Sequence, residues 1–368
     1  MRGVAARPAR GRRRVSGYRT DAAIATGNGW TIVENASLEG RNTFRVKARA
    51  DLLVDIHDDA ALEEIFAFRG LAERPVLVLG EGSNLLFAGD WPGIVLSMAT
   101  RGIEVVEDDG VQALVRVAAG ENWNDFVHWS LAHGFAGLEN LVLIPGTVGA
   151  APIQNIGAYG VEVGDAIAGV HLWDRRDRVR RHLARDDCAF AYRDSLFKRD
   201  AERLLVVAVD FRLDRRPALR LDYAGIVTEL ERLGDGPPTP RRVAEAVARL
   251  RMRKLPNPAV IGNAGSFFKN PLVDADTAAA LHAAHPELPQ WPAAAGQVKL
   301  SAAWLIEACG LKGWREGDAG VSAQHALVLV NHGRASGAEL WNVARHVVDG
   351  VRARFGIALE PEPRIIGG

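Results

Sequence analysis

The chain has 368 residues, a length typical of two or three domains, with an ordinary globular balance of 48% hydrophobic and 24% charged residues. Basic and acidic residues number 45 each, so the formal net charge is zero. This balance argues against a dedicated nucleic-acid binder and a polybasic membrane anchor, since both depend on excess positive charge. No apolar run is long enough to span a membrane, and Cys188 and Cys309 form neither a disulfide framework nor a zinc-type spacing. We therefore expect a cytoplasmic protein with no metal.

The N-terminal segment differs in charge from the remainder. Residues 1–20 contain seven arginines and no acidic residue, which leaves 38 basic and 45 acidic side chains in the rest of the chain. The segment has neither apolar periodicity nor the hydrophobic stretch of a signal peptide. We expect residues 1–36 to be a disordered extension or a misassigned start, with an organelle transit peptide as the alternative. Their deletion should then leave folding and activity intact.

From residue 42 onwards the sequence alternates strand-like and helix-like patterns. Alternating and β-branched residues predict strands, and 3.6-residue periodicity with polar caps predicts helices. Strands are expected over 44–56, 75–79, 93–119, 167–173, 204–213 and 326–331, and helices over 60–70, 122–133, 240–254, 274–284, 301–310 and 337–355. Breaks at 214–222 and 234–240 divide an α+β chain into two regions joined near 217–240.

Two glycine-rich segments stand out. Gly80-Glu81-Gly82-Ser83-Asn84 directly follows the strand over 75–79, where backbone N–H groups can approach a pyrophosphate. Position 85 is leucine, so this is not a Rossmann fingerprint. The second segment, 138–160, has four glycines after position 145 and no acidic residue from 141 to 161. Glycines permit close backbone approach and neutral amides can bind a planar, phosphate-bearing ligand, whereas a tight turn and a buried connector are the structural alternatives.

Four further segments contain chemically capable residues. Arg193 lies between Tyr192 and Asp194, Ser266 follows Gly265 beside two phenylalanines, basic residues end the helix over 240–254, and Glu362 lies between two prolines. Ser266 has no GxSxG frame, so a hydrolase nucleophile is not supported. Each segment also has an ordinary interpretation: a surface ion pair, a structural turn, cations at a helix C-terminus, or a solvated tail.

The order of these segments resembles the UDP-N-acetylenolpyruvoylglucosamine reductase family. The matching stretches are Arg41-Asn42-Thr43-Phe44, LGEGSNLLF, GLENLVLIPGTVGAAPIQNIGAYG, FAYRDSLFK, KLPNP, GNAGSFFKNP and LEPEPRIIG. They cover about residues 37–368. A tyrosine at 223 resembles the longer family type, which has a tyrosine loop over the substrate.

The resemblance implies an α+β fold with a PCMH/vanillyl-alcohol-oxidase-like FAD-binding domain of two subdomains and a smaller α+β substrate-binding domain. We expect the first over 42–216, with 356–368 returning beside it, and the second over 222–355.

The resemblance also implies the reaction. NADPH reduces noncovalently bound FAD, and hydride then passes from flavin N5 to the enolpyruvyl C=C of the UDP-sugar, giving UDP-N-acetylmuramate. Arg193 and Glu362 match the positions that polarise the substrate carboxylate, and Ser266 matches the proton donor, with Lys254 or water as a relay. The substrate is a small-molecule UDP-sugar, and we expect a monomer.

Binding residues carry over in the same way. The matched cofactor positions are Gly80, Glu81, Gly82, Ser83, Asn84, Pro145, Gly146, Gln154, Asn155, Gly157, Ala158 and Tyr159. The matched substrate positions are Tyr223, Arg251, Lys254, Asn270, Lys312 and His325, where His325 stands in place of the Gln of some relatives.

Two other functions remain open at this stage. Another flavin oxidase of the same superfamily would explain the glycine segments but not GSFFKNP or LEPEPR, and oxygen consumption with a reduced substrate would favour it. A module that senses a UDP-sugar without turnover would purify without a yellow chromophore.

Overall fold

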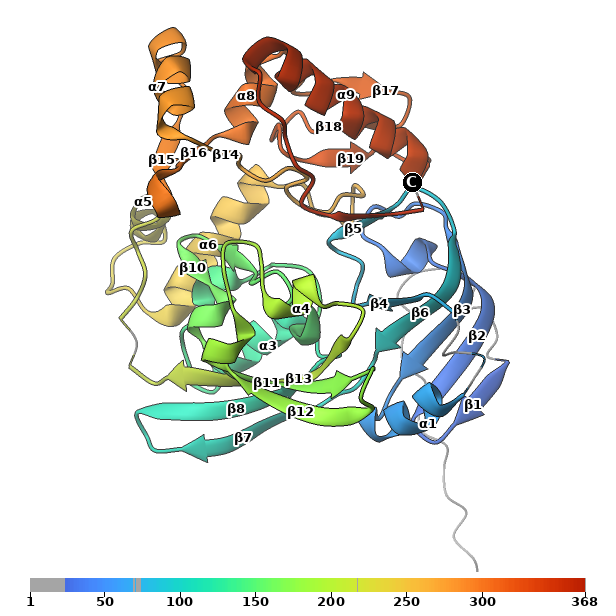
Figure 1. The fold of residues 1–368 in the computed structure, drawn as a ribbon. Coiled ribbons are helices and arrows are strands. Elements are labelled where there is room, and N and C mark those ends of the chain that lie inside the picture. Colours follow the sequence, from blue (N-terminus) through green and yellow to red (C-terminus); the bar gives the residue numbers. More distant parts are fainter. Residues whose placement is uncertain (1–23, 69, 71–73, 217, 368) are drawn as a thin grey trace, which may run out of the picture.

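The computed structural model describes residues 24–68, 70, 74–216 and 218–367, and the arginine-rich segment 1–20 lies outside these ranges. Figure 1 shows two sheet-containing subdomains side by side in the first part of the chain, with a helical C-terminal domain above them. The α+β class expected from the sequence is confirmed.

The first subdomain is a five-stranded sheet with the order β1-β2-β3-β6-β4. β3 and β4 pair in parallel with β6, whereas β1-β2 and β2-β3 are antiparallel. Its elements are β1 (Ala25–Gly27), β2 (Trp30–Ser37), β3 (Arg49–Ile56), α1 (Leu62–Ala67), β4 (Val76–Leu79) and β6 (Trp91–Met98).

The expectation that residues 1–36 are disordered is wrong for their last part, which forms β1 and most of β2. Strand β2 pairs with β3 from Trp30 to Ser37, and Trp30 and Ala36 are buried. Trp30 also donates a hydrogen bond to Glu64 at 3.1 Å. The sequence pattern was missed because only two of the eight residues of this strand are buried. Residues 1–23 lie outside the described residues.

Both faces of the first sheet are buried. Val54, Ile94 and Leu96 belong to a core shared with the second subdomain, while the adjacent Leu53 and Val95 belong to a core shared with the C-terminal domain. Successive side chains of a strand point to opposite faces, so this sheet is the layer between the other two parts.

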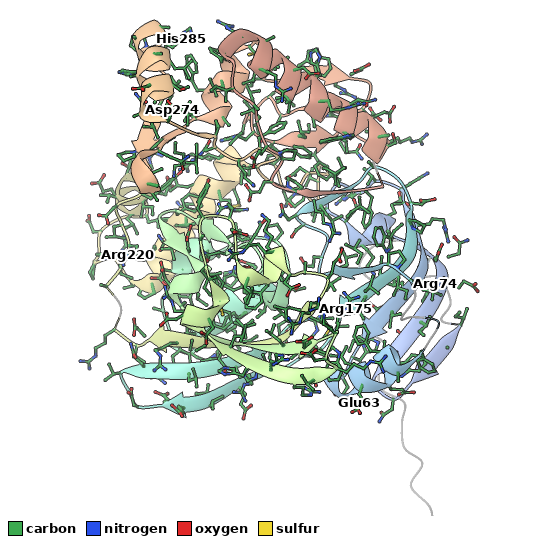
Figure 2. The ribbon with its side chains drawn as sticks, viewed as in Figure 1. Glu63, Arg74, Arg175, Arg220, Asp274 and His285 are labelled. Carbon is green, nitrogen blue, oxygen red and sulfur yellow. The ribbon has the colours of Figure 1, made fainter. Side chains whose placement is uncertain are left out.

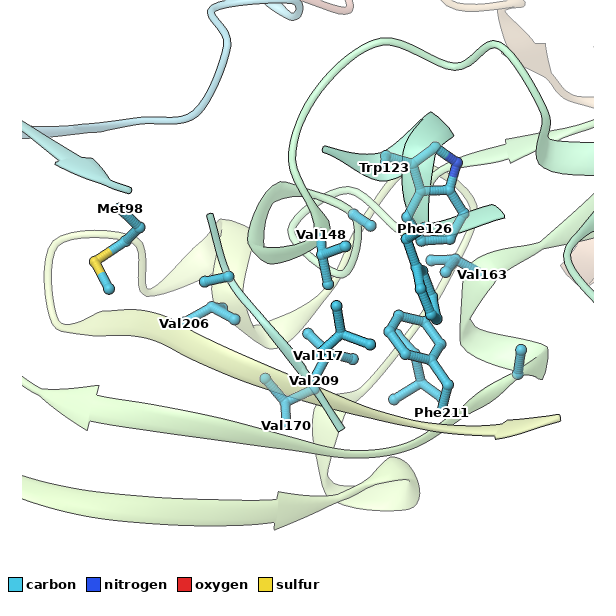
Figure 3. Packing of buried hydrophobic residues seen from close by; sticks show 14 of the residues in the cluster. Met98, Val117, Trp123, Phe126, Val148, Val163, Val170, Val206, Val209 and Phe211 are labelled. Atoms are coloured by element: carbon cyan, nitrogen blue, oxygen red, sulfur yellow. The ribbon is translucent and has the colours of Figure 1, made fainter. Parts of the chain in front are cut away.

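The second subdomain is an antiparallel sheet with the order β12-β11-β13-β8-β7, covered by helix α3. Phe126 of α3 packs on Phe211 of the sheet with ring centroids 4.9 Å apart (Figure 3). Its elements are β7 (Ile103–Asp108), β8 (Gln112–Ala118), α3 (Trp123–Ala132), β9 (Gly157–Ala158), β10 (Val161–Glu162), β11 (Ile167–Asp174), β12 (Val179–Ala184), α4 (Leu196–Arg199) and β13 (Leu204–Asp214).

Helices α5 (Ile226–Arg232) and α6 (Pro240–Lys254) require a correction to the expected domain boundary at 222. Their buried residues Ile226, Val243 and Val247 belong to the core that contains Phe211. The amphipathic face of α6 therefore covers the second subdomain rather than the C-terminal domain. The C-terminal residues of the core shared with the first sheet all follow Lys254.

The C-terminal domain contains two small sheets and three helices. Its last strand, β20 (Arg364–Ile366), pairs in parallel with β5 (Leu85–Phe87), directly after the first glycine segment. The other elements are β14 (Leu272–Val273), α7 (Ala275–Ala284), β15 (Gln290–Pro292), β16 (Val298–Leu300), α8 (Ala302–Ala308), β17 (Arg315–Glu316), β18 (Ala319–Val321), β19 (Leu329–Asn331) and α9 (Gly337–Phe355). Among the described residues, no helix is both long and apolar enough to cross a membrane.

Candidate active site

One open cavity of about 1340 Å³ lies where the three parts meet. It exceeds the roughly 300–1,000 Å³ of a typical small-molecule pocket. Its lining comes from both glycine segments, the Arg193 loop, the Ser266 turn and the segment around Glu362. Residues far apart in the sequence thus share one site that is large enough for more than one ligand.

Glu81 links the two glycine segments through hydrogen bonds. Its carboxylate accepts hydrogen bonds from the Gly146 amide at 3.0 Å and from Asn122 at 2.6 Å. Ser83 donates to the Pro145 carbonyl at 3.2 Å. A Cβ on Gly82 would lie 2.1 Å from the Arg41 carbonyl, and one on Gly149 would lie 2.6 Å from Ala119 Cβ. Glycine is needed at both positions because the backbone runs too close for a side chain.

Ten of the twelve expected cofactor residues line the cavity. Gly146 and Asn155 do not, among the described lining residues. The Asn155 amide is buried and is bound to Glu162, to the Ala191 carbonyl and to the Gly164 N–H. The Asn155 side chain therefore stabilises the loops that carry the cofactor residues, although it does not face the cavity. Gly146 contributes in the same way, because its amide donates a hydrogen bond to Glu81.

Arg193 and Glu362, 169 positions apart in sequence, meet in the cavity. Arg193 Nε lies 3.1 Å from Glu362 Oε1, which also lies 3.4 Å from Gln154 Nε2. Arg193 additionally donates to the Gly157 carbonyl at 2.6 Å. Burial raises the pKa of Glu362 above its ordinary value, although Arg193, Lys198 and Lys269 oppose the shift. The carboxyl group is therefore easier to protonate than an exposed glutamate.

Arg193 is held in an uncommon backbone conformation, with φ of 54°. A non-glycine residue in the left-handed region costs energy that the surrounding structure must supply, and such residues cluster at functional sites. Lys198 supports the loop by donating to the Arg193 carbonyl at 2.8 Å. Burial also lowers the pKa of Lys198. Lys198 was missed as a site residue, although it lies within the FAYRDSLFK stretch and lines the cavity.

Ser266 lines the cavity at the end of a tight turn. Gly265 has φ of 71° and its amide donates to Asn263 at 2.9 Å. The next residue, Phe267, is fully buried, its amide donates to the Leu327 carbonyl, and its carbonyl accepts from the Glu362 amide at 2.7 Å. Within the described part of the chain, the Ser266 hydroxyl forms no hydrogen bond. The backbone thus fixes Ser266 beside the Glu362 segment and leaves its hydroxyl for a ligand.

The six expected substrate residues divide into two groups. Tyr223, Arg251, Asn270 and His325 line the cavity, whereas Lys254 and Lys312 are exposed and are not among its lining residues. Lys254 Nζ lies 5.5 Å from the centroid of the Tyr223 ring, which packs edge-on against Tyr159 at 5.0 Å. The expected relay of a proton through Lys254 to Ser266 has no support from this placement.

His325 is neutral and has a defined tautomer. Its Nδ1 accepts the Leu327 amide at 3.2 Å, so the proton of the neutral ring is on Nε2. Burial, assisted by Lys254 and Lys312, lowers its pKa. The two lysines are therefore close enough to act on the cavity electrostatically without lining it.

Comparison with known proteins identifies the family. The family model for an FAD binding domain matches residues 50–182, and that for the C-terminal domain of UDP-N-acetylenolpyruvoylglucosamine reductase matches 257–366. A reductase of that name from Xanthomonas euvesicatoria is 54% identical over 93% of this chain and 98% of its own length. The chain belongs to the UDP-N-acetylenolpyruvoylglucosamine reductase family.

Other relatives of this family agree. The reductase of the same name from Xanthomonas oryzae is 53% identical over 92% of this chain and 97% of its own. The solved reductase structure from Thermus caldophilus aligns with a TM-score of 0.64 at 26% identity, over 91% of this chain and 98% of that one. The expected family and FAD-binding fold are confirmed. The C-terminal match begins at 257, just after helix α6 ends at Lys254.

The residues of the cavity fit FAD. Both glycine segments line the cavity, where backbone N–H groups can bind a diphosphate. Gln154 and Asn84, which hydrogen-bond to each other, supply neutral amides next to Glu362. We infer that Gly80–Asn84, Pro145, Gln154 and Gly157–Tyr159 would hold the cofactor.

Proposed function

We propose that this protein is an FAD-dependent oxidoreductase that uses NADPH to reduce the enolpyruvyl C=C bond of UDP-N-acetylenolpyruvoylglucosamine to UDP-N-acetylmuramate. The observation that supports it most is one cavity in which the glycine walls of an FAD-binding domain face Arg193, Glu362 and Ser266. The product is a peptidoglycan precursor, so the reaction serves cell-wall synthesis and thereby cell shape and division.

When bound, FAD supplies hydride that originates from NADPH. Cys188 and Cys309 lie outside the cavity lining, and His325, the one histidine among its described lining residues, lies in the C-terminal domain. These placements favour noncovalent binding of the cofactor.

Arg193 and Glu362 act on the substrate carboxylate. An enol ether is electron-rich, so hydride addition to its CH2 carbon needs the negative charge to spread into the attached carboxylate. Arg193, fixed by Gly157 and Glu362, stabilises that charge through preorganised hydrogen bonds. Glu362 can share a proton with the incoming carboxylate, which its raised pKa favours.

Ser266 donates the proton to the carbon next to the carboxylate. Its hydroxyl is free of other described partners. The Glu362 amide donates to the Phe267 carbonyl, which brings the backbones of the two segments together, and both Ser266 and Glu362 line the cavity. A positioned proton donor contributes about 10²–10⁴-fold to a rate. Because serine is a weak acid and Lys254 lies outside the lining, we propose that water restores the serine proton.

Arg251, Tyr223, Asn270 and His325 hold the nucleotide part of the substrate. Arg251 supplies the charge among the four, and Lys254 and Lys312 strengthen the positive potential from outside the lining. Asn270 also accepts the Ala302 amide at 3.0 Å, which ties this position to helix α8. A monomeric, cytoplasmic enzyme without nucleic-acid or membrane partners remains our prediction.

The function is tested by an anaerobic assay of the purified yellow protein. NADPH should bleach the flavin absorbance, and addition of the enolpyruvyl UDP-sugar should restore it with formation of UDP-N-acetylmuramate. Flavin that is reoxidised by oxygen but not by the sugar nucleotide would contradict the proposal and favour an oxidase. Protein without a chromophore would favour a sensing module.

A further inference from the structure

A second, smaller pocket lies at the seam between the two subdomains of the FAD-binding region. Its volume is about 330 Å³, and its lining combines Phe66 and Arg74 of the first subdomain with Arg175, Arg176 and Arg178 of the second. Figure 2 shows Arg74 and Arg175 on the two parts that meet there. Nothing in the proposed reaction uses these residues.

Arg175 is the unusual residue of this seam. Its Nε and Nη1 atoms are buried and have no hydrogen-bond partner among the described residues. The guanidinium lies over the Phe66 ring at 5.5 Å, and Phe66 stacks on Trp173, whose Nε1 is also buried without a partner. Buried polar groups are nearly always satisfied, because leaving one unpaired is costly. Arg175 lines the pocket, whereas Trp173 does not. An acceptor-rich ligand in the pocket would give the Arg175 guanidinium the hydrogen-bond partner that it lacks among the described residues.

The surrounding charges indicate the sign of that ligand. Arg203 is paired with Asp174 and Asp177, and Arg74 lies 3.6 Å from Asp51. For Arg175, Arg176 and Arg178 the described residues offer no ion pair within 4 Å.

Two carboxylates also line the pocket. Asp200 lies 3.9 Å from Arg203, and Glu202 is exposed and acts on Arg175 only through its field. Three arginines are thus left with a single unpaired carboxylate near them.

We propose that this seam pocket binds a phosphate-class anion, inorganic phosphate or diphosphate, with Arg175 as its anchor. A guanidinium presents several N–H donors in a rigid fork that matches phosphate oxygens. The volume far exceeds the roughly 30 Å³ of one water, so a diphosphate fits as well as a phosphate. Arg176 and Arg178, both exposed, add charge at the mouth.

The position of the pocket gives the anion a structural consequence. Val76, Asp200 and Glu202 line both this pocket and the large cavity, so the two are adjacent. An anion held between Arg74 and Arg175 joins the subdomains whose glycine segments form the cofactor wall. Bound phosphate should therefore slow loss of FAD from the holoenzyme.

The test is calorimetric titration of the FAD-loaded protein with phosphate and with diphosphate, in a phosphate-free buffer at constant ionic strength. We expect saturable binding of one anion per chain and slower FAD release at saturation. Arg175→Met keeps an apolar side chain over Phe66 and should weaken binding at least tenfold. Arg180→Met is the matched control, because Arg180 pairs with Asp59 at 2.6 Å and does not line the pocket.

If Arg175→Met fails to fold, the double variant Arg176→Gln with Arg178→Gln tests the same site. Both side chains are exposed, so their replacement should not disturb folding. It should weaken the anion affinity severalfold. Absence of binding to the wild-type holoenzyme would overturn the proposal, as would affinity equal in Arg175→Met and wild type. Phosphate binding only after FAD removal would also overturn it, because the cofactor itself would then occupy the pocket.

Discussion

The two walls of the large cavity are built in different ways. The cofactor wall consists of glycine segments whose backbone runs within van der Waals distance of neighbouring backbone, at Gly82 and Gly149 above all. The facing wall depends on charged side chains, with Arg193, Glu362 and Lys198 linked by hydrogen bonds and by their fields. The cofactor wall thus depends on glycine positions where a side chain would not fit, and the facing wall depends on hydrogen bonds between charged side chains.

This difference suggests a division of labour. The cofactor wall binds mainly through its backbone, and its Glu81 carboxylate is taken up by hydrogen bonds to Gly146 and Asn122, whereas the charged wall can change protonation and stabilise developing charge. Substitutions in the first should therefore affect FAD retention, and substitutions in the second should affect reduction of the substrate.

The largest expected effect comes from the charged wall. Arg193→Met removes the donor that faces the substrate carboxylate and should slow flavin reoxidation by the enolpyruvyl sugar by roughly 10²–10³-fold. Flavin reduction by NADPH should change much less. Stopped-flow absorbance measures both steps. Arg249→Met, an exposed arginine paired with Glu245, is the control and should resemble wild type.

The sheet behind the cofactor wall gives the next largest effect. A chain that begins at residue 38 lacks β2 and the buried Trp30, and loss of a buried tryptophan side chain alone costs about 3–5 kcal/mol. We expect a marked fall in the free energy of unfolding and in FAD content, compared with a chain that begins at residue 24. Equal denaturation midpoints for the two chains would show that β2 is dispensable.

The backbone wall itself is tested at Gly149. A Cβ there would meet Ala119 Cβ at 2.6 Å and the Ala119 backbone at 3.1 Å, so Gly149→Ala should cost about 1–3 kcal/mol and weaken FAD binding. Gly70→Ala is the control, since no atom of the described residues, its chain neighbours aside, lies within 4 Å of a Cβ at that position. Fluorescence of released flavin reports the retention of the cofactor. Normal retention in Gly149→Ala would contradict the backbone account of this wall.

A smaller effect concerns pH. Burial raises the pKa of Glu362, so the protonated form persists to higher pH than for an exposed glutamate. Two facing carboxylates repel, so the protonated form should favour the substrate. The rate of flavin reoxidation should then fall as pH rises through this raised pKa. In Glu362→Gln the side chain stays neutral, so the rate should not fall with pH in this range. The same pH profile in both proteins would show that protonation of Glu362 does not control the rate.

Much of the fold was predictable from local sequence. The helices over 240–254 and 337–355 have capping residues and clear periodicity, and the structure places α6 and α9 there. Strand β2 was missed because only two of its eight residues are buried, which leaves a weak hydrophobic pattern. The packing of α5 and α6 on the second subdomain was also missed, because an amphipathic face does not specify which core it covers.

The site divides in the same way. The glycine segments could be recognised from composition, since close backbone approach requires glycine. The contact between Arg193 and Glu362 spans 169 positions and follows only from the return of the C-terminal strand beside β5. Tertiary packing also decides that Lys254 and Lys312 are exposed and that the Asn155 amide bonds to Glu162 inside the protein.

The division between the two walls is tested most directly at Ser266, the proposed proton donor. In Ser266→Ala, bleaching of the flavin by NADPH should stay within about threefold of wild type, while reoxidation by the enolpyruvyl sugar should fall by at least about 10²-fold. Stopped-flow measurement of both steps under anaerobic conditions gives the two rates. Reoxidation at the wild-type rate, or equal loss in both steps, would contradict the account.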